Sequence, residues 1–176
     1  MSMLIFGLLV FFVLAQVYVE AINEGPDCRW WRESMSHYLG EVEHAGVQAL
    51  AFLGLALAEV LMIFEFAHGT AWRVCLALAA AGLVGVTVTG ISNPDWKWHP
   101  LVQRAHVVCS GFAFGAALVA EAVYLWHTPS IWLVFGAALT ALGFARFAPD
   151  KSALEEKFFA AWVIAAFVAI AGVPMP

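Results

Sequence analysis

Six long apolar stretches decide what this chain can fold into. Each is close to the ~20 residues that an α-helix needs to cross ~30 Å of hydrocarbon. Of the 176 residues, 63% are hydrophobic and 12% are charged, whereas soluble domains average about 45–50% and about 25%. The sequence therefore predicts an all-α integral membrane protein, a six-helix bundle that forms one domain over residues 1–176. The predicted membrane spans are Met3–Ile22, Val42–Phe66, Trp72–Ile91, Leu101–Trp126, Ile131–Phe147 and Phe158–Val173.

The connections between these spans are short, except for the first loop, Asn23–Gly40. That loop carries aromatic residues among its charges, and we expect it to lie against the membrane interface as a partial lid. Of the eight Lys and Arg residues, all but Arg73 belong to the first, third and fifth loops. By the positive-inside rule, these three loops are predicted to be cytoplasmic, with both termini outside.

Two of the spans carry the same polar pattern, displaced by 62 positions. Its steps of three and four residues keep all members on one face of an α-helix. The pattern predicts a parallel repeat in which helices two and four are equivalent. Because ionisable groups in apolar helices tend to face a bundle interior, it also indicates a shared internal site. The first copy comprises His37, Glu41, His44, Gln48, Phe52, Leu55 and Glu59, and the second comprises His99, Gln103, His106, Ser110, Phe114, Ala117 and Glu121.

The histidines of both copies form one layer of the predicted bundle. Imidazole is a common metal ligand, and the pair His44 and His106 is predicted to bind haem, a chlorin or a metal ion. A symmetric di-iron centre is not expected, because Gln103 stands where the repeat would need a second Glu. The alternative is that these histidines only form hydrogen bonds with neighbouring helices or lipid headgroups. The candidate metal ligands are His37, Glu41, His44, His99 and His106.

Two glutamates form a second layer of the pattern. Glu59 lies ~22 Å from His44 along its helix, at ~1.5 Å per residue, and Glu121 takes the equivalent position in the second copy. If the two carboxyls face each other, they can share a proton or bind a cation. The alternative is that both lie close enough to the outer interface to reach water.

Other kinds of chemistry have little support in the sequence. The three cysteines match neither a disulfide framework nor a metal motif. A net charge of −5, with scattered Lys and Arg, argues against a nucleic-acid partner. No nucleophile elbow or comparable catalytic pattern is present. Enzymatic activity stays open at this stage, and a non-catalytic protein is favoured.

Three short motifs carry a resemblance to a known family. They are the segment Arg32–Gly40, the turn Asn93–Asp95 with the following His106, and the charged step Leu154–Lys157 before helix six. With them the chain resembles the bacterial six-helix membrane proteins catalogued as domain of unknown function 998, and more distantly the DRAM/FRAG-type proteins. The resemblance implies a compact six-helix bundle in a bacterial inner membrane and no particular activity. The chain departs from the family pattern at Glu156–Lys157, where a Glu-Arg pair is expected, and in its number of histidines.

Three hypotheses for function follow from the sequence. The favoured one is a non-catalytic accessory subunit of a membrane complex, or a lipid-interacting factor. The second is a cofactor protein that uses His44 and His106. The third is a small proton- or cation-coupled transporter that uses Glu59 and Glu121. The expected partners are membrane lipids and other membrane subunits or a second copy of the chain.

Overall fold

The computed structural model of this chain is helical, with no strand among the residues it describes. Six helical spans are present within these residues, and this confirms the all-α fold that the sequence predicts. The described residues are 2–22, 35, 39, 45–66, 69–91, 99–148 and 152–172.

Five of the spans are single α-helices, and the remaining one, Pro100–Leu125, is built from three consecutive parts. In that span a short π-helix separates two α-helices. The elements are α1 (Ser2–Ile22), α2 (Ala45–Glu65), α3 (Thr70–Ile91), α4 (Pro100–Gly111), η3 (Phe112–Ala116), α5 (Ala117–Leu125), α6 (Ile131–Phe147) and α7 (Ser152–Gly172).

Four spans are long and apolar enough to cross a membrane, among the residues that the structure describes: Met3–Ile22, Ala45–Glu65, Thr70–Ile91 and Pro100–Leu125. Helix α6 is a shorter apolar helix. Large apolar side chains, Phe64 and Leu139 among them, are exposed over the outer surface. Soluble monomers rarely expose large contiguous apolar patches, so this surface suits a lipid environment. Which membrane holds the protein, and in which orientation, stay predictions.

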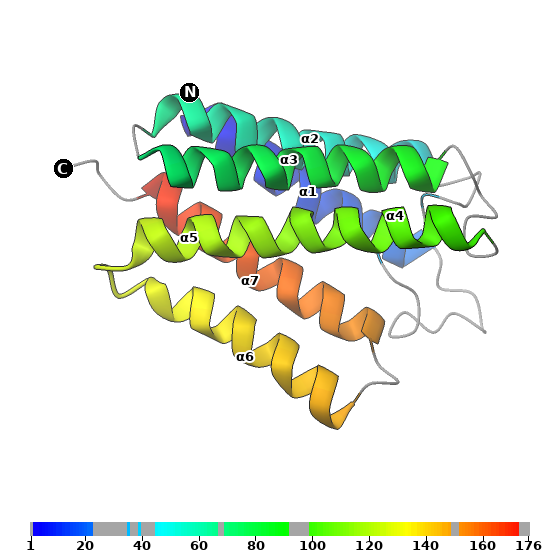
Figure 1. The fold of residues 1–176 in the computed structure, drawn as a ribbon. Coiled ribbons are helices and arrows are strands. Elements are labelled where there is room, and N and C mark those ends of the chain that lie inside the picture. Colours follow the sequence, from blue (N-terminus) through cyan, green and yellow to red (C-terminus); the bar gives the residue numbers. More distant parts are fainter. Residues whose placement is uncertain are drawn as a thin grey trace.

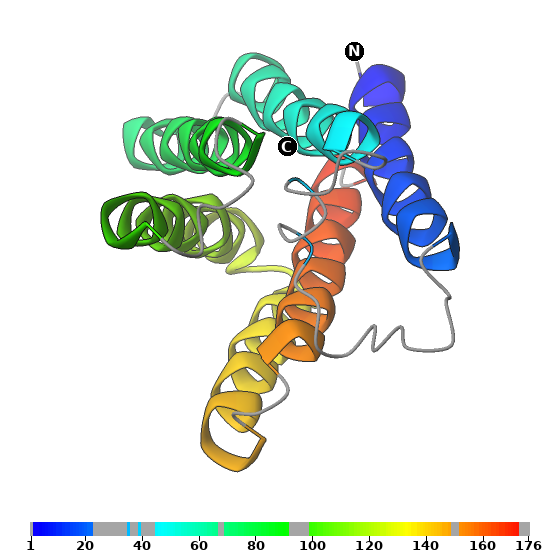
Figure 2. The same cartoon turned by 90° about the vertical axis from the view of Figure 1, so that its right-hand side faces the viewer.

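Five of the spans enclose a common interior. Helix α1 packs on α2, α2 on α3, α3 on the Pro100–Leu125 span, α5 on α7, and α7 on α1. The end-on view in Figure 2 shows this arrangement, with α6 outside it and beside α7. Helices α6 and α7 are inclined to the others (Figure 1). We call the end where α1 finishes and α7 begins the Ile22 end, and the opposite end the Ser2 end (Figure 1).

Among the described glycines, the closest helix contacts are those of Gly82 and Gly85 on α3 with the end of α4 and the π segment. A Cβ atom added to Gly82 would overlap the backbone of Ala113 and lie 2.6 Å from the carbonyl oxygen of Cys109. One added to Gly85 would lie 2.5 Å from the Cys109 Sγ. Small residues let membrane helices approach this closely, and the resulting van der Waals contact holds them together where lipid offers no hydrophobic driving force.

The two spans of the predicted repeat differ in their helical structure. Helix α2 is an uninterrupted α-helix from Ala45, whereas the span that should be its equivalent contains the π segment. In a π-helix each backbone hydrogen bond skips one more residue than in an α-helix, so the register of the second copy shifts at this point. The repeat stays a prediction.

Candidate functional site

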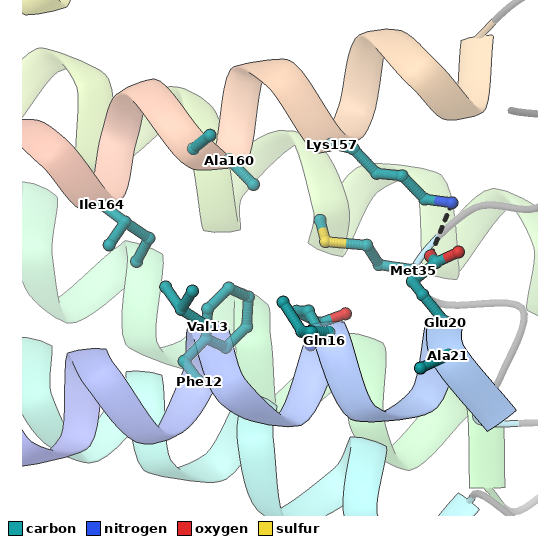
Figure 3. A pocket seen from close by; sticks show the side chains of 11 residues that line it. Phe12, Val13, Gln16, Glu20, Ala21, Met35, Lys157, Ala160 and Ile164 are labelled. Atoms are coloured by element: carbon teal, nitrogen blue, oxygen red, sulfur yellow. Dashed lines mark ion pairs between the residues drawn. The ribbon is translucent and has the colours of Figure 1, made fainter. Parts of the chain in front are cut away.

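A groove of about 450 Å³ lies between α1 and α7 at the Ile22 end of the bundle (Figure 3). It is open at the surface, because Val13, Val17 and Ala161 in its walls are exposed. Its lining residues are Phe12, Val13, Gln16, Val17, Glu20, Ala21, Met35, Lys157, Ala160, Ala161 and Ile164.

Helical spacing explains why these residues line one groove. On α1 they fall into two rows with steps of four residues, one from Phe12 to Glu20 and one from Val13 to Ala21. Residues four apart lie above one another on a helix surface, so each row forms a continuous strip. At ~1.5 Å per residue, the stretch from Phe12 to Ala21 is ~13 Å long. The small side chains of Ala160 and Ala161 on α7 leave the space between these strips and α7 open.

The end of the groove nearest Ile22 is charged. The Lys157 Nζ of α7 lies 2.6 Å from the Glu20 Oε1 of α1, and the two side chains are 16% and 23% exposed (Figure 3). One turn deeper, the Gln16 Oε1 accepts a hydrogen bond of 3.0 Å from the buried Gln48 Nε2 of α2. The groove thus changes from apolar at Phe12 to polar at Gln16 and ionic at Glu20.

Met35 reaches the groove from the first loop. Its side chain is buried and lies between α1 and α7 (Figure 3). Its backbone forms a hydrogen bond with the carboxyl of Glu156, which precedes the apolar stretch of α7. Burial raises the pKa of Glu156 to about 7, although this hydrogen bond and the Lys157 charge act in the opposite direction. The other described loop residue, Leu39, is buried against Gly90 of α3. The remaining lid residues lie outside the described part of the chain.

A second, smaller pocket lies between α1 and α7 at the Ser2 end. Its volume is about 330 Å³, and its lining contains no ionisable side chain. The residues that line it are Met3, Phe6, Val168, Ala171 and Gly172. Of these two spaces between α1 and α7, only the larger has a charged end.

The two predicted carboxyls both lie in the bundle interior. Glu59 of α2 is 1% exposed and Glu121 of α5 is 0% exposed, and the two interact electrostatically. Within the described residues, neither oxygen of Glu121 has a hydrogen-bond partner, and the same holds for the Glu59 Oε2. Both side chains are thus withdrawn from the surface of this chain. Their predicted role in holding a proton or a cation stays a prediction.

The predicted histidine layer is only partly described. His37, Glu41 and His44 lie outside the described residues. His99 is exposed next to the start of α4, while His106 is buried and its Nδ1 lies 2.9 Å from the Thr89 Oγ1 of α3. No group of three or more His, Cys, Asp or Glu suited to a metal ion occurs in the described ranges. The metal and haem or chlorin sites stay predictions.

The groove is not among the sites that the sequence predicts. No role is expected for α1 from the sequence, although Gln16 and Glu20 are polar residues one helical turn apart in a largely apolar helix. This spacing is the signal that could have indicated a polar face on α1. Its partner Lys157 is distant in the sequence, and no pattern connects the two.

Comparison of the chain with protein-family models, with curated proteins and with solved structures gives no match. The resemblance to the six-helix family described above stays a prediction.

Proposed function

We propose that this protein is a lipid-interacting membrane protein, and that the groove between α1 and α7 binds an acyl chain of a membrane lipid. The observation that supports this proposal is the groove itself, with its apolar walls, its lateral opening and its one charged end. A membrane lipid has the same polarity profile, with hydrocarbon at one end and charge at the other.

The dimensions of the groove agree with this occupant. Its length of ~13 Å along α1 is close to half of the ~30 Å hydrocarbon thickness of a bilayer, which is the depth of one leaflet. The ionic pair then lies near the headgroup level, and Phe12 and Ile164 lie toward the bilayer centre. Ligand pockets of about 300–1,000 Å³ are typical of small-molecule sites, and this groove falls in that range.

Photo-crosslinking tests the proposal. The protein is reconstituted with a phospholipid that carries a diazirine in one acyl chain, and adducts are mapped by mass spectrometry. We expect more labelling of Val13 and Val17 in the groove than of the lipid-facing Val84 on α3. The Ala161→Trp variant fills the groove and should remove the excess at Val13 and Val17.

The matched control is Ala81→Trp, which adds the same side chain to an exposed position of α3. It should leave the labelling of the groove unchanged. Equal labelling of Val13, Val17 and Val84 in the unmodified protein, insensitive to Ala161→Trp, would contradict the proposal.

The buried carboxyls favour a second candidate function, proton- or cation-coupled transport through the bundle interior. Carboxyl groups inside a membrane are costly and commonly serve ion pathways. In proteoliposomes, Glu59→Gln and Glu121→Gln should each abolish proton or sodium flux, while Glu155→Gln at the start of α7 should not. Flux that persists in both interior variants would argue against transport by this pair.

Two hypotheses from the sequence stay open beside these. An accessory subunit should copurify with a partner from its native membrane. A protein that binds haem or a chlorin through His44 and His106 should absorb between 350 and 800 nm, and His106→Ala should remove the band.

A further inference from the structure

The groove carries a pair of opposite charges, and this pair has a consequence for the kind of lipid that fits it. Building on the proposed function, we infer that the groove selects a zwitterionic phospholipid with a primary amine, of the phosphatidylethanolamine class. Its phosphate would lie on Lys157 and its ammonium group on Glu20, with one acyl chain along the apolar wall.

Charge complementarity is the first argument. Lys157 and Glu20 both line the groove at the same end, and the Lys157 Nζ lies 2.6 Å from the Glu20 Oε1. An anionic headgroup attracted to Lys157 brings a second negative charge beside Glu20, and this repulsion opposes binding. A headgroup with both charges can place each next to its opposite, so that attraction is gained at both ends without breaking the ion pair.

The chemistry of the carboxylate is the second argument. A primary ammonium group has three N–H donors, as a lysine side chain has, and forms charge-assisted hydrogen bonds with a carboxylate. The quaternary ammonium of a choline headgroup has no N–H and cannot donate to Glu20. The pair therefore distinguishes an ethanolamine headgroup from a choline headgroup of the same net charge.

Gln16 gives the third argument. Its Oε1 is occupied by the hydrogen bond from Gln48, while its Nε2 is buried and has no acceptor among the described residues. Gln16 lies one helical turn below Glu20 on the same strip of α1. A buried amide donor without an acceptor is costly. The ester carbonyl of a glycerophospholipid follows its phosphate at about this depth and can supply the missing acceptor.

The test uses three phospholipids with the same diazirine-bearing chain and different headgroups: ethanolamine, choline and glycerol. Each is presented to the full-length protein in nanodiscs of otherwise identical composition. Labelling of Val13 and Val17 should be about fivefold higher with ethanolamine than with either other headgroup. This ratio corresponds to the largest free energies measured for single exposed ion pairs. This comparison needs no variant and so does not depend on how a substitution affects folding.

A variant then tests the cause of the preference. Glu20→Gln removes the carboxylate that pairs with Lys157 at the end of the groove, so the preference should move from ethanolamine to the anionic glycerol headgroup. Arg146→Gln removes an exposed cation at the Ile22 end of α6, outside the groove, and should leave the preference unchanged.

The outcomes separate the two proposals. Groove labelling that is equal for the three headgroups, or a preference that survives Glu20→Gln, overturns the headgroup inference while the acyl-chain proposal stands. Absence of excess groove labelling with all three lipids overturns both.

Discussion

Two helix contacts in this bundle are built in opposite ways. Where α3 meets the end of α4 and the π segment, Gly82 and Gly85 have no side chain, and the backbone of Ala113 and the side chain of Cys109 occupy the space. Where α1 meets α7, the helices approach less closely and leave about 450 Å³ between them at the Ile22 end. The first contact has no room for one added carbon, whereas the second can hold a molecule.

The difference indicates that separate helix contacts serve stability and binding in this bundle. In a membrane, apolar side chains gain little by leaving lipid, so close van der Waals packing has to hold helices together. The α3 contact supplies such packing. The α1–α7 contact is less closely packed, and the groove occupies the space between the two helices. Mutations at the two contacts should therefore affect different properties.

The strongest test of the comparison is Gly82→Val. The added carbons would overlap the Ala113 backbone, which cannot move without displacing the π segment. Overpacking of this kind costs about 3 kcal/mol, and we expect that loss in the free energy of unfolding, measured by denaturation in detergent micelles. Gly111→Ala, where an added Cβ meets nothing within 4 Å, is the control and should be nearly neutral. A Gly82→Val protein as stable as the control would remove the basis of the comparison.

A smaller effect is expected from Gly85→Ala. Its Cβ would lie 2.5 Å from the Cys109 Sγ, and we expect a cost of about 1–2 kcal/mol. Because the obstacle is a side chain, Cys109→Ala should recover part of the loss in the double variant. The coupling is measured by a double-mutant cycle. Additive effects of the two substitutions would show that they do not share this contact.

A polar contribution to the same contact is expected to be smaller still. Thr89→Val removes the hydrogen bond between α3 and His106 of α4. Hydrogen bonds between membrane helices average about 0.6 kcal/mol, with a maximum of about 1.7. The same unfolding assay should give a loss in that range. A loss above that of Gly85→Ala would mean that the polar contact, rather than packing, holds α3 to α4.

The smallest effect on stability is expected in the groove. Ala161→Trp places its side chain in open space at an exposed position of α7. Substitutions at such positions usually change stability by less than about 0.5 kcal/mol. The variant should unfold with the unmodified protein in micelles while it loses groove labelling in nanodiscs. A loss comparable to that of Gly82→Val would show that the groove is part of the packed core.

The sequence predicts the six helices, because a long apolar run is a local signal, and four of them are long and apolar enough to cross a membrane among the described residues. It also identifies Glu59 and Glu121, whose spacing places them on the faces that the bundle buries. It does not predict the groove, because the separation of α1 and α7 depends on every helix between them. The pairing of Glu20 with Lys157 is likewise a property of the assembled bundle.

The π segment is the other feature without a clear local signal. Its residues, Phe112–Ala116, are ordinary for an apolar helix. It shifts the helical register within a single span, whereas the predicted pattern from His99 to Glu121 counts only α-helical steps.

That shift gives the span an unusual tolerance of a change in chain length. A π segment winds less per residue than an α-helix, so it accommodates one extra residue within the same rotation of the chain. Deleting one residue between Phe112 and Ala116 would let the segment return to an ordinary α-helix. The buried faces before and after the deletion would then keep their orientation, and Glu121 would stay in the interior. One missing codon at this point would thus shorten the span by one residue without turning a carboxyl toward the lipid.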